Sequence, residues 1–283
     1  MTMPIQSDSG ASRPAAPVGI FDSGLGGLSV LRAVRAHLPG ESFVYVADSR
    51  HAPYGERDDA FITERTVAIG EWLAQQGAKA LVVACNTATA QSIAVARARL
   101  AIPLVGVEPG IKPAVLQSAS RVAGVLATQA TLRSARFQAL LDRYGADCRF
   151  LCQAGHGLVQ AVESGDTASP TLHALLESYL QPMLDAGADT LVLGCTHYPL
   201  LSGLIQLAMG ETVTLVSSAE ETAKDLVRVL TELDLLRPHD APPATRAFEA
   251  TGDPEAFIRL ASRFLGPALH GVRPVRRHVS AST

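Results

Sequence analysis

Two short stretches of the sequence place a cysteine beside polar side chains that could help it to move a proton. They are Cys85-Asn86-Thr87 and Cys195-Thr196-His197. A thiolate can act as a base and a thiol as an acid, and a neighbouring histidine or carboxylate can assist either form. Two such cysteines on opposite faces of one substrate could remove a proton from a stereogenic carbon and return one from the other side. The pair therefore indicates racemisation, and the alternative is that both cysteines are buried packing residues.

The two cysteines end matching copies of one segment. Residues 77–85 (GAKALVVAC) align without gaps on residues 187–195 (GADTLVLGC), with five of nine positions identical at a constant offset of 110 residues. Each copy is a glycine followed by a buried strand. Ligands of open α/β sheets bind beyond the carboxyl ends of the strands, so the repeat favours function over packing for both cysteines. We expect two halves related by a pseudo-twofold, with both cysteines pointing into one cleft.

Strands and helices alternate along the chain, which favours parallel sheets covered on both faces. Strands are expected at residues 18–21, 43–47, 80–84, 104–107, 122–127, 149–153, 190–194, 213–216 and 246–251. Helices are expected at residues 28–38, 58–76, 87–100, 132–144, 171–186, 199–208, 219–235 and 254–264. The predicted fold class is therefore α/β, with two similar parallel-sheet α/β domains and the active site in the cleft between them.

A glycine-rich turn follows the first strand at residues 22–27 (DSGLGG). It lacks the third glycine of the dinucleotide pattern and the lysine of a phosphate-binding loop. Its backbone N–H groups could still hold a carboxylate, and the alternative is a tight turn with no ligand. The loop at residues 48–55 offers a carboxylate, a phenol and backbone amides. Cys148, Cys152 and His156 do not have zinc-site spacing, so no metal is expected.

Composition excludes several classes of protein. The chain has 283 residues, of which 47% are hydrophobic and 18% charged, so it has enough apolar material for about two domains. The net charge of −3 and the lack of a basic run argue against a nucleic-acid partner, and none is expected. No stretch of 18 apolar residues occurs, which argues against a membrane span. Because the N-terminus lacks the pattern of a signal peptide, we expect a cytoplasmic protein with free thiols.

The polar stretches together resemble the glutamate racemases, a cofactor-independent family within the aspartate/glutamate racemase superfamily. The matching stretches are VGIFDSGLGGLSV (18–30), YVADSRHAPYG (45–55), VVACNTATA (82–90), VGVEPGIKPA (105–114), LVQAVESG (158–165) and LGCTHYPLL (193–201). The resemblance implies interconversion of L-glutamate and D-glutamate, with D-glutamate supplied for peptidoglycan synthesis. It also implies that no pyridoxal phosphate, other cofactor or metal is used, and that the protein is a homodimer.

The resemblance assigns roles to individual residues. Cys85 would take the α-proton from D-glutamate with help from Asp22, and Cys195 would take it from L-glutamate with help from His197. The substrate's ammonium and carboxylate groups would be held by Asp22, Ser23, Tyr54, Gly55, Asn86, Thr87, Thr196 and His197. Three further positions would support the site, namely Asp48, Thr128 and Glu163.

The resemblance also implies that the second domain is inserted into the first. We expect a disordered leader at residues 1–16, a first α/β domain at 17–108 and 218–270, a second at 109–217, and a flexible tail at 271–283. Two other functions stay open. One is a sister enzyme that acts on aspartate, another amino acid or a hydantoin. The other is a non-catalytic binding or regulatory protein on the same scaffold, with DNA gyrase as one conceivable partner.

Overall fold

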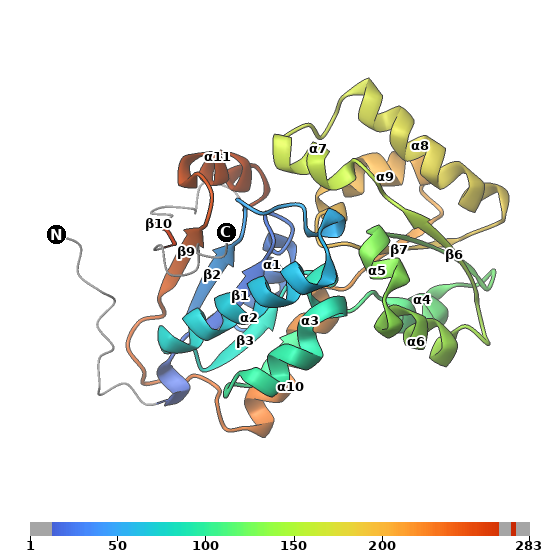
Figure 1. Cartoon of the computed structure of the whole chain (residues 1–283). Helices are drawn as coiled ribbons and strands as arrows, with labels where there is room; N and C mark the ends of the chain where they lie inside the picture. The colour runs from blue at the N-terminus through green and yellow to red at the C-terminus, as the bar shows by residue number, and fades with distance from the viewer. Residues whose placement is uncertain (1–12, 266–272, 276–283) are drawn as a thin grey trace.

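The computed structural model describes residues 13–265 and 273–275, and within them the strands form two sheets (Figure 1). Sheet A has six strands in the order β10-β9-β2-β1-β3-β4, and sheet B has four in the order β6-β5-β7-β8. All neighbouring strands in both sheets are parallel. The predicted α/β class with two parallel sheets is confirmed.

The strand bounds agree closely with the sequence pattern. Sheet A contains β1 (Val18–Asp22), β2 (Phe43–Ala47), β3 (Ala80–Val83), β4 (Leu104–Gly106), β9 (Arg246–Ala250) and β10 (Arg273–Pro274). Sheet B contains β5 (Val122–Ala127), β6 (Arg149–Ala154), β7 (Thr190–Gly194) and β8 (Thr214–Ser217).

Helices cover both faces of each sheet (Figure 1). On sheet A, one buried cluster lies under α1 (Leu28–His37), α10 (Ala219–Glu232) and α11 (Pro254–Leu265), and the other under α2 (Asp59–Gln75) and α3 (Asn86–Arg99). On sheet B, one cluster involves α7 (Leu158–Ser164), α8 (Pro170–Asp185) and α9 (Ser202–Met209), and the other α4 (Ile111–Gln117) and α6 (Ala135–Tyr144). The part of the chain that the structure describes also contains the short 3-10 helices η1 (Arg13–Ala15), η2 (Tyr54–Glu56) and η3 (Tyr198–Leu201).

The internal repeat occupies equivalent places in the two sheets. Strand order β2-β1-β3-β4 in sheet A matches β6-β5-β7-β8 in sheet B, so the repeated segments form β3 and β7. Each begins at a glycine with a left-handed backbone, Gly77 at φ +84° and Gly187 at φ +82°, a conformation that favours glycine. Cys85 and Cys195 therefore lie just beyond the carboxyl ends of two matching strands, β3 and β7. The pseudo-twofold between the halves stays a prediction.

The chain passes from sheet A to sheet B after β4 and returns after β8, and α10 then packs against α1. The expected domain limits, 17–108 with 218–270 and 109–217, stay a prediction. Within the expected leader, Arg13–Ala15 form η1, and within the expected flexible tail, Arg273–Pro274 pair with β9. The rest of those two predictions, residues 1–12, 271–272 and 276–283, lies outside the described residues.

Two of the expected helices need correction, and two further helices were not expected. The single helix expected at 132–144 is two, α5 (Gln129–Arg133) and α6, because Ser134 has an extended backbone and its side chain caps α6 at Phe137 N–H. The helix expected at 199–208 starts as η3 and continues as α9. Helices α4 and α7 were not expected, since seven residues are too few to show a helical repeat of apolar positions.

Candidate active site

Cys85 is the N-cap residue of α3. Its sulfur accepts a hydrogen bond from Ala88 N–H at 3.5 Å and donates to Ser23 Oγ at 3.6 Å. Burial and the negative charge of Asp22 raise the pKa of the Cys85 thiol to about 12, although the contacts with Ala88 and Ser23 act in the opposite direction. Cys85 is therefore a neutral thiol in this state, and it needs a proton acceptor or a nearby cation to become a thiolate.

Cys195 follows β7, and its sulfur lies 3.8 Å from Nδ1 of the buried His197. The other ring nitrogen of His197, Nε2, lies 2.6 Å from Glu163 Oε1. Burial opposes a charged imidazole, but the contacts with Cys195 and Glu163 outweigh it and raise the pKa of His197 well above its ordinary value. Unlike Cys85, Cys195 is not followed directly by an α-helix, because η3 lies between the cysteine and α9.

Asp22 lies at the end of β1, and its carboxylate accepts hydrogen bonds from both halves of the molecule. It is fully buried, its Oδ2 accepts a hydrogen bond from Gly24 N–H at 2.8 Å, and its Oδ1 accepts one from Thr196 Oγ1 at 3.3 Å. Burial raises the pKa of Asp22, although the charge of His197 lowers it. A carboxylate with a raised pKa takes a proton from a thiol more readily, so Asp22 is suited to serve as the proton acceptor for Cys85.

The glycine-rich turn allows the sheet A backbone to approach sheet B closely. A β-carbon at Gly24 would collide with the carboxylate of Glu163, and one at Gly26 would stand 2.5 Å from Thr196 Oγ1. Leu25 N–H donates to Glu163 Oε1 at 2.8 Å, which is the oxygen that also contacts the histidine ring. The glycines at these positions are therefore explained by close packing between the two halves of the molecule.

Asn86 and Thr87 follow Cys85 on α3 and face the second half of the molecule. Thr87 Oγ1 lies 2.9 Å from Thr128 Oγ1, at the start of α5. Asn86 is 3% exposed, and neither its Nδ2 nor its Oδ1 has a hydrogen-bond partner among the described residues. Asn86, Cys195 and Thr196 border the same narrow gap, so this amide lies near the second cysteine. Because an unpaired buried amide is costly, Asn86 is well suited to hold a polar group of a substrate.

Asp48 bonds to Tyr54 and to residues that were not singled out from the sequence. It accepts hydrogen bonds from Tyr54 Oη at 2.6 Å, from Thr251 Oγ1 at 2.7 Å and from two nitrogens of Arg65 at 2.9 Å. Burial would raise the pKa of Asp48, but the bonds from His51, Arg65 and Tyr54 outweigh it and hold this pKa well below its ordinary value. Asp48 is thus an anion at neutral pH, and it accepts the hydrogen bond that holds the Tyr54 phenol.

Arg65 had a signal in the sequence that was overlooked. It lies on α2 with the buried side chains of Ile62, Ile69 and Leu73, which repeat at helical spacing. A charged residue on such a face must have a buried partner.

Gly55, the residue after Tyr54, contacts the second half of the molecule directly, since a β-carbon there would stand 3.1 Å from Thr128 Cβ.

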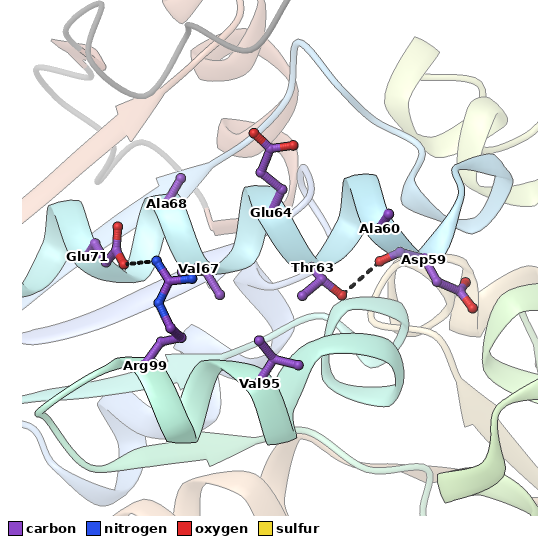
Figure 2. A pocket seen from close by; sticks show the side chains of 9 residues that line it. All are labelled: Asp59, Ala60, Thr63, Glu64, Val67, Ala68, Glu71, Val95 and Arg99. Atoms are coloured by element: carbon purple, nitrogen blue, oxygen red, sulfur yellow. Dashed lines mark hydrogen bonds and ion pairs between the residues drawn. The ribbon is translucent and has the colours of Figure 1, made fainter.

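A wide, open cavity of about 650 Å³ lies between α2 and α3 (Figure 2), and no cysteine is among the residues that line it. Asp59, Thr63 and Glu71 on α2 and Val95 and Arg99 on α3 line it, and Arg99 forms an ion pair with Glu71 at 2.9 Å. None of the residues that sequence analysis assigned to the site lines this cavity. The polar side chains at the strand ends are therefore the better candidate site.

The sequence analysis expected neither a metal site nor a membrane span. Cys148 is buried before β6 and Cys152 is exposed on it, and the described residues contain no group of three or more candidate metal ligands. In the same part of the chain, no helix has the length and apolar character needed to cross a membrane.

The comparisons with known proteins identify the family of this chain. Residues 28–226 match the family model described as Asp/Glu/Hydantoin racemase. Since the match covers most of the chain, the protein belongs to the Asp/Glu/Hydantoin racemase family and is an enzyme.

Within that family the chain is similar to glutamate racemases. The glutamate racemase of Ralstonia pickettii is 55% identical over 257 residues, which are 91% of this chain and 90% of that protein. The crystal structure of the Francisella tularensis glutamate racemase in complex with D-glutamate has a TM-score of 0.82 at 27% identity, covering 93% of this chain and 98% of that one. The Escherichia coli enzyme in complex with L-glutamate and the activator UDP-MurNAc-ala has a TM-score of 0.80 at 30% identity, covering 92% and 97%. The resemblance seen in the sequence is confirmed.

Proposed function

We propose that this chain interconverts L-glutamate and D-glutamate by two proton transfers at Cα, without a cofactor. The observation that carries the proposal is the placement of two cysteines at matching strand ends, each near its own buried proton partner. Asp22 acts on Cys85 through its charge, and His197 contacts Cys195 at 3.8 Å. The similarity to glutamate racemases, whose structures include complexes with D-glutamate and with L-glutamate, supports glutamate as the substrate.

In the direction from D to L, Asp22 accepts the thiol proton of Cys85, and the resulting thiolate removes the proton from Cα. The electron pair of the broken C–H bond stays on the substrate and is delocalised into its α-carboxylate. The thiol of Cys195 then gives its proton to the opposite face of Cα, and His197 returns a proton to that sulfur. The direction from L to D follows the same steps in reverse.

The high pKa of Cys85 describes the site without substrate. A substrate brings an ammonium group, and a positive charge near a thiol favours its thiolate form. Each tenfold gain in rate requires about 1.4 kcal/mol of additional stabilisation of the transition state. Hydrogen bonds to the α-carboxylate, which becomes more negative as the proton leaves, are the natural source of that stabilisation.

The polar residues around the cysteines hold the substrate in this proposal. Asn86 is the best candidate for binding the substrate, because its buried amide has no partner among the described residues. The other binding residues are Ser23, Tyr54, Gly55, Thr87 and Thr196, with Asp22 and His197 contributing charge. Thr128, Asp48 and Glu163 support them through the contacts with Thr87, Tyr54 and His197.

Circular dichroism of L-glutamate and of D-glutamate, each incubated with the pure protein without pyridoxal phosphate, tests the activity. We expect both signals to decay to zero. If both stay constant while the thiols are reduced, glutamate is the wrong substrate, and aspartate and hydantoins are the next to test.

Three cellular aspects extend the proposal. We propose that the product D-glutamate serves peptidoglycan synthesis, that the protein acts in the cytoplasm, and that it forms a homodimer. Their support is the family resemblance. Depletion of the protein in its host should be rescued by external D-glutamate, and light scattering of the pure protein should give twice the mass of 29.7 kDa. A strain that is not rescued, or a monomeric mass, would contradict the respective statement.

A further inference from the structure

We propose that Arg65 is a positioning residue of the substrate site, which acts through Asp48 on the turn formed by Tyr54 and Gly55. This inference rests on the proposed function. Arg65 lies in the middle of α2, and its side chain is 5% exposed. Its Nε donates to Asp48 Oδ2 and its Nη2 to Asp48 Oδ1, both at 2.9 Å. Such a two-point contact fixes the orientation of the carboxylate as well as neutralising its charge.

The carboxylate oriented by Arg65 in turn orients Tyr54. The phenol donates to Asp48 Oδ2 at 2.6 Å, on the same oxygen that Arg65 Nε contacts. Tyr54 is 1% exposed and packs in the buried cluster that also contains Cys85. Burial and the charge of Asp48 raise the pKa of Tyr54, so the phenol keeps its proton and stays a donor. Arg65 therefore determines where Tyr54 lies beside the first cysteine.

The next residue brings the turn to the polar groups that the substrate would meet. A β-carbon at Gly55 would stand 3.1 Å from Thr128 Cβ, so the backbone of the turn lies against the second half of the molecule. Thr128 Oγ1 lies 2.9 Å from Thr87 Oγ1, two residues beyond Cys85. Without Arg65, the carboxylate of Asp48 would be oriented by its other partners, and the turn would lose its fixed position against Thr128.

The remaining partners of Asp48 show why Arg65 matters for orientation. His51 Nδ1 lies 3.0 Å from Asp48 Oδ1, and Thr251 Oγ1 donates to that same oxygen at 2.7 Å. Both therefore act on Oδ1, whereas Arg65 is the residue that contacts both oxygens. Removal of Arg65 leaves Oδ1 held by His51 and Thr251, whereas Oδ2 loses the guanidinium that lies beside Tyr54.

A double-mutant cycle on steady-state kinetics tests the inference, using Arg65→Met, Tyr54→Phe and the combined variant. We expect Arg65→Met to raise KM for both enantiomers about tenfold, as the loss of a charge-assisted hydrogen bond predicts. kcat should stay within about threefold, because a contact held equally in the ground and transition states affects KM alone. The combined variant should be no worse than the more impaired single variant, since both substitutions act through the same oxygen of Asp48.

Two further variants separate positioning from general destabilisation. Arg65→Lys keeps the charge with one donor group, so it should raise KM less than Arg65→Met does. Lys79→Met breaks a buried ion pair with Glu41 at 2.8 Å, at the end of β3 opposite Cys85. It should lower the melting temperature and leave KM unchanged.

The inference is overturned if Arg65→Met leaves KM unchanged, if Lys79→Met raises KM equally, or if the effects of the cycle are additive. Should Arg65→Met fail to fold, Arg65→Lys decides, and an unchanged KM in that variant overturns the inference. Failure of the proposed function is distinguishable from these results. In that case the unmodified chain would not turn over glutamate at all, whereas failure of this inference leaves its turnover intact.

Discussion

Glu163 is the side chain whose replacement most clearly tests how the second cysteine is supported. Its Oε1 accepts hydrogen bonds from His197 Nε2 at 2.6 Å and from Leu25 N–H at 2.8 Å. Glu163→Gln keeps the size and one acceptor oxygen but removes the negative charge. Hydrogen bonds to charged groups contribute about 1.5–3 kcal/mol and neutral ones about 0.5–1.5 kcal/mol, so the expected loss is about 1–2 kcal/mol. This corresponds to a decrease in kcat/KM of about 5-fold to 30-fold.

Circular dichroism progress curves from each enantiomer provide the assay. The two enantiomers have equal free energies in solution, so kcat/KM must decrease by the same factor in both directions. The pH dependence gives a second signature. Burial favours the neutral form of His197, and Glu163 opposes it, so loss of the negative charge lowers the pKa of His197. The alkaline limb of the kcat/KM profile should therefore move to lower pH.

A neighbouring residue on α7 provides the control. Ser164 donates its hydroxyl to Ala161 O within the same helix, and Ser164→Ala should leave kcat/KM and its pH profile unchanged. If Glu163→Gln behaves like Ser164→Ala, the proposal that Glu163 sustains the proton on His197 is refuted.

Three other substitutions have defined outcomes. Gly26→Ala places a β-carbon 2.5 Å from Thr196 Oγ1, so we expect loss of glutamate turnover by circular dichroism progress curves. Lys79→Met leaves Glu41 buried without its cation, so urea titration should show a free energy of unfolding lower by about 3–5 kcal/mol. Asp48 has a lowered folded pKa, so its stabilising contribution is present above its unfolded pKa of about 3.9 and is lost as the pH falls through the folded pKa. The stability difference between Asp48→Asn and the parent, measured by urea titration at pH 7 and at pH 3, should therefore narrow at the lower pH.

Each of these expectations has a result that would contradict it. Normal turnover by Gly26→Ala would mean that the close approach of the two halves is not needed for activity. For Lys79, the exposed pair of Lys224 and Glu221 is the matched control, and Lys224→Met should lower the free energy of unfolding far less than Lys79→Met does. Equal losses for the two lysines would contradict the role of burial. A stability difference for Asp48→Asn that does not change with pH would contradict the lowered pKa.

The ends of β3 and β7 could be predicted from the sequence because the same pattern occurs twice. A glycine, an apolar run and a cysteine recur at a fixed offset, and the structure places both runs in equivalent central strands. The left-handed backbones of Gly77 and Gly187 explain why glycine begins each copy. Local patterns of this kind are readable because a buried parallel strand is apolar throughout.

The side-chain partners could not be predicted, because no local pattern records a contact between distant residues. The bond from Thr251 to Asp48 joins residues that are 203 positions apart, and Glu163 meets Leu25 across 138 positions. The break between α5 and α6 could not be predicted either, although its cause is local. A single serine, Ser134, supplies the cap in a stretch whose apolar spacing continues. Arg65 was within reach of sequence reasoning, because a charge on the buried face of α2 requires a partner.

The measurement that tests the two-cysteine proposal most directly is the fate of the Cα hydrogen in deuterated water. L-glutamate is incubated with the protein in D₂O, and both enantiomers are recovered early and analysed by mass spectrometry. Two bases on opposite faces predict that the D-glutamate formed carries deuterium at Cα while the remaining L-glutamate keeps its protium. The result that would contradict the account is D-glutamate that retains protium, since one group would then have removed and returned the same proton.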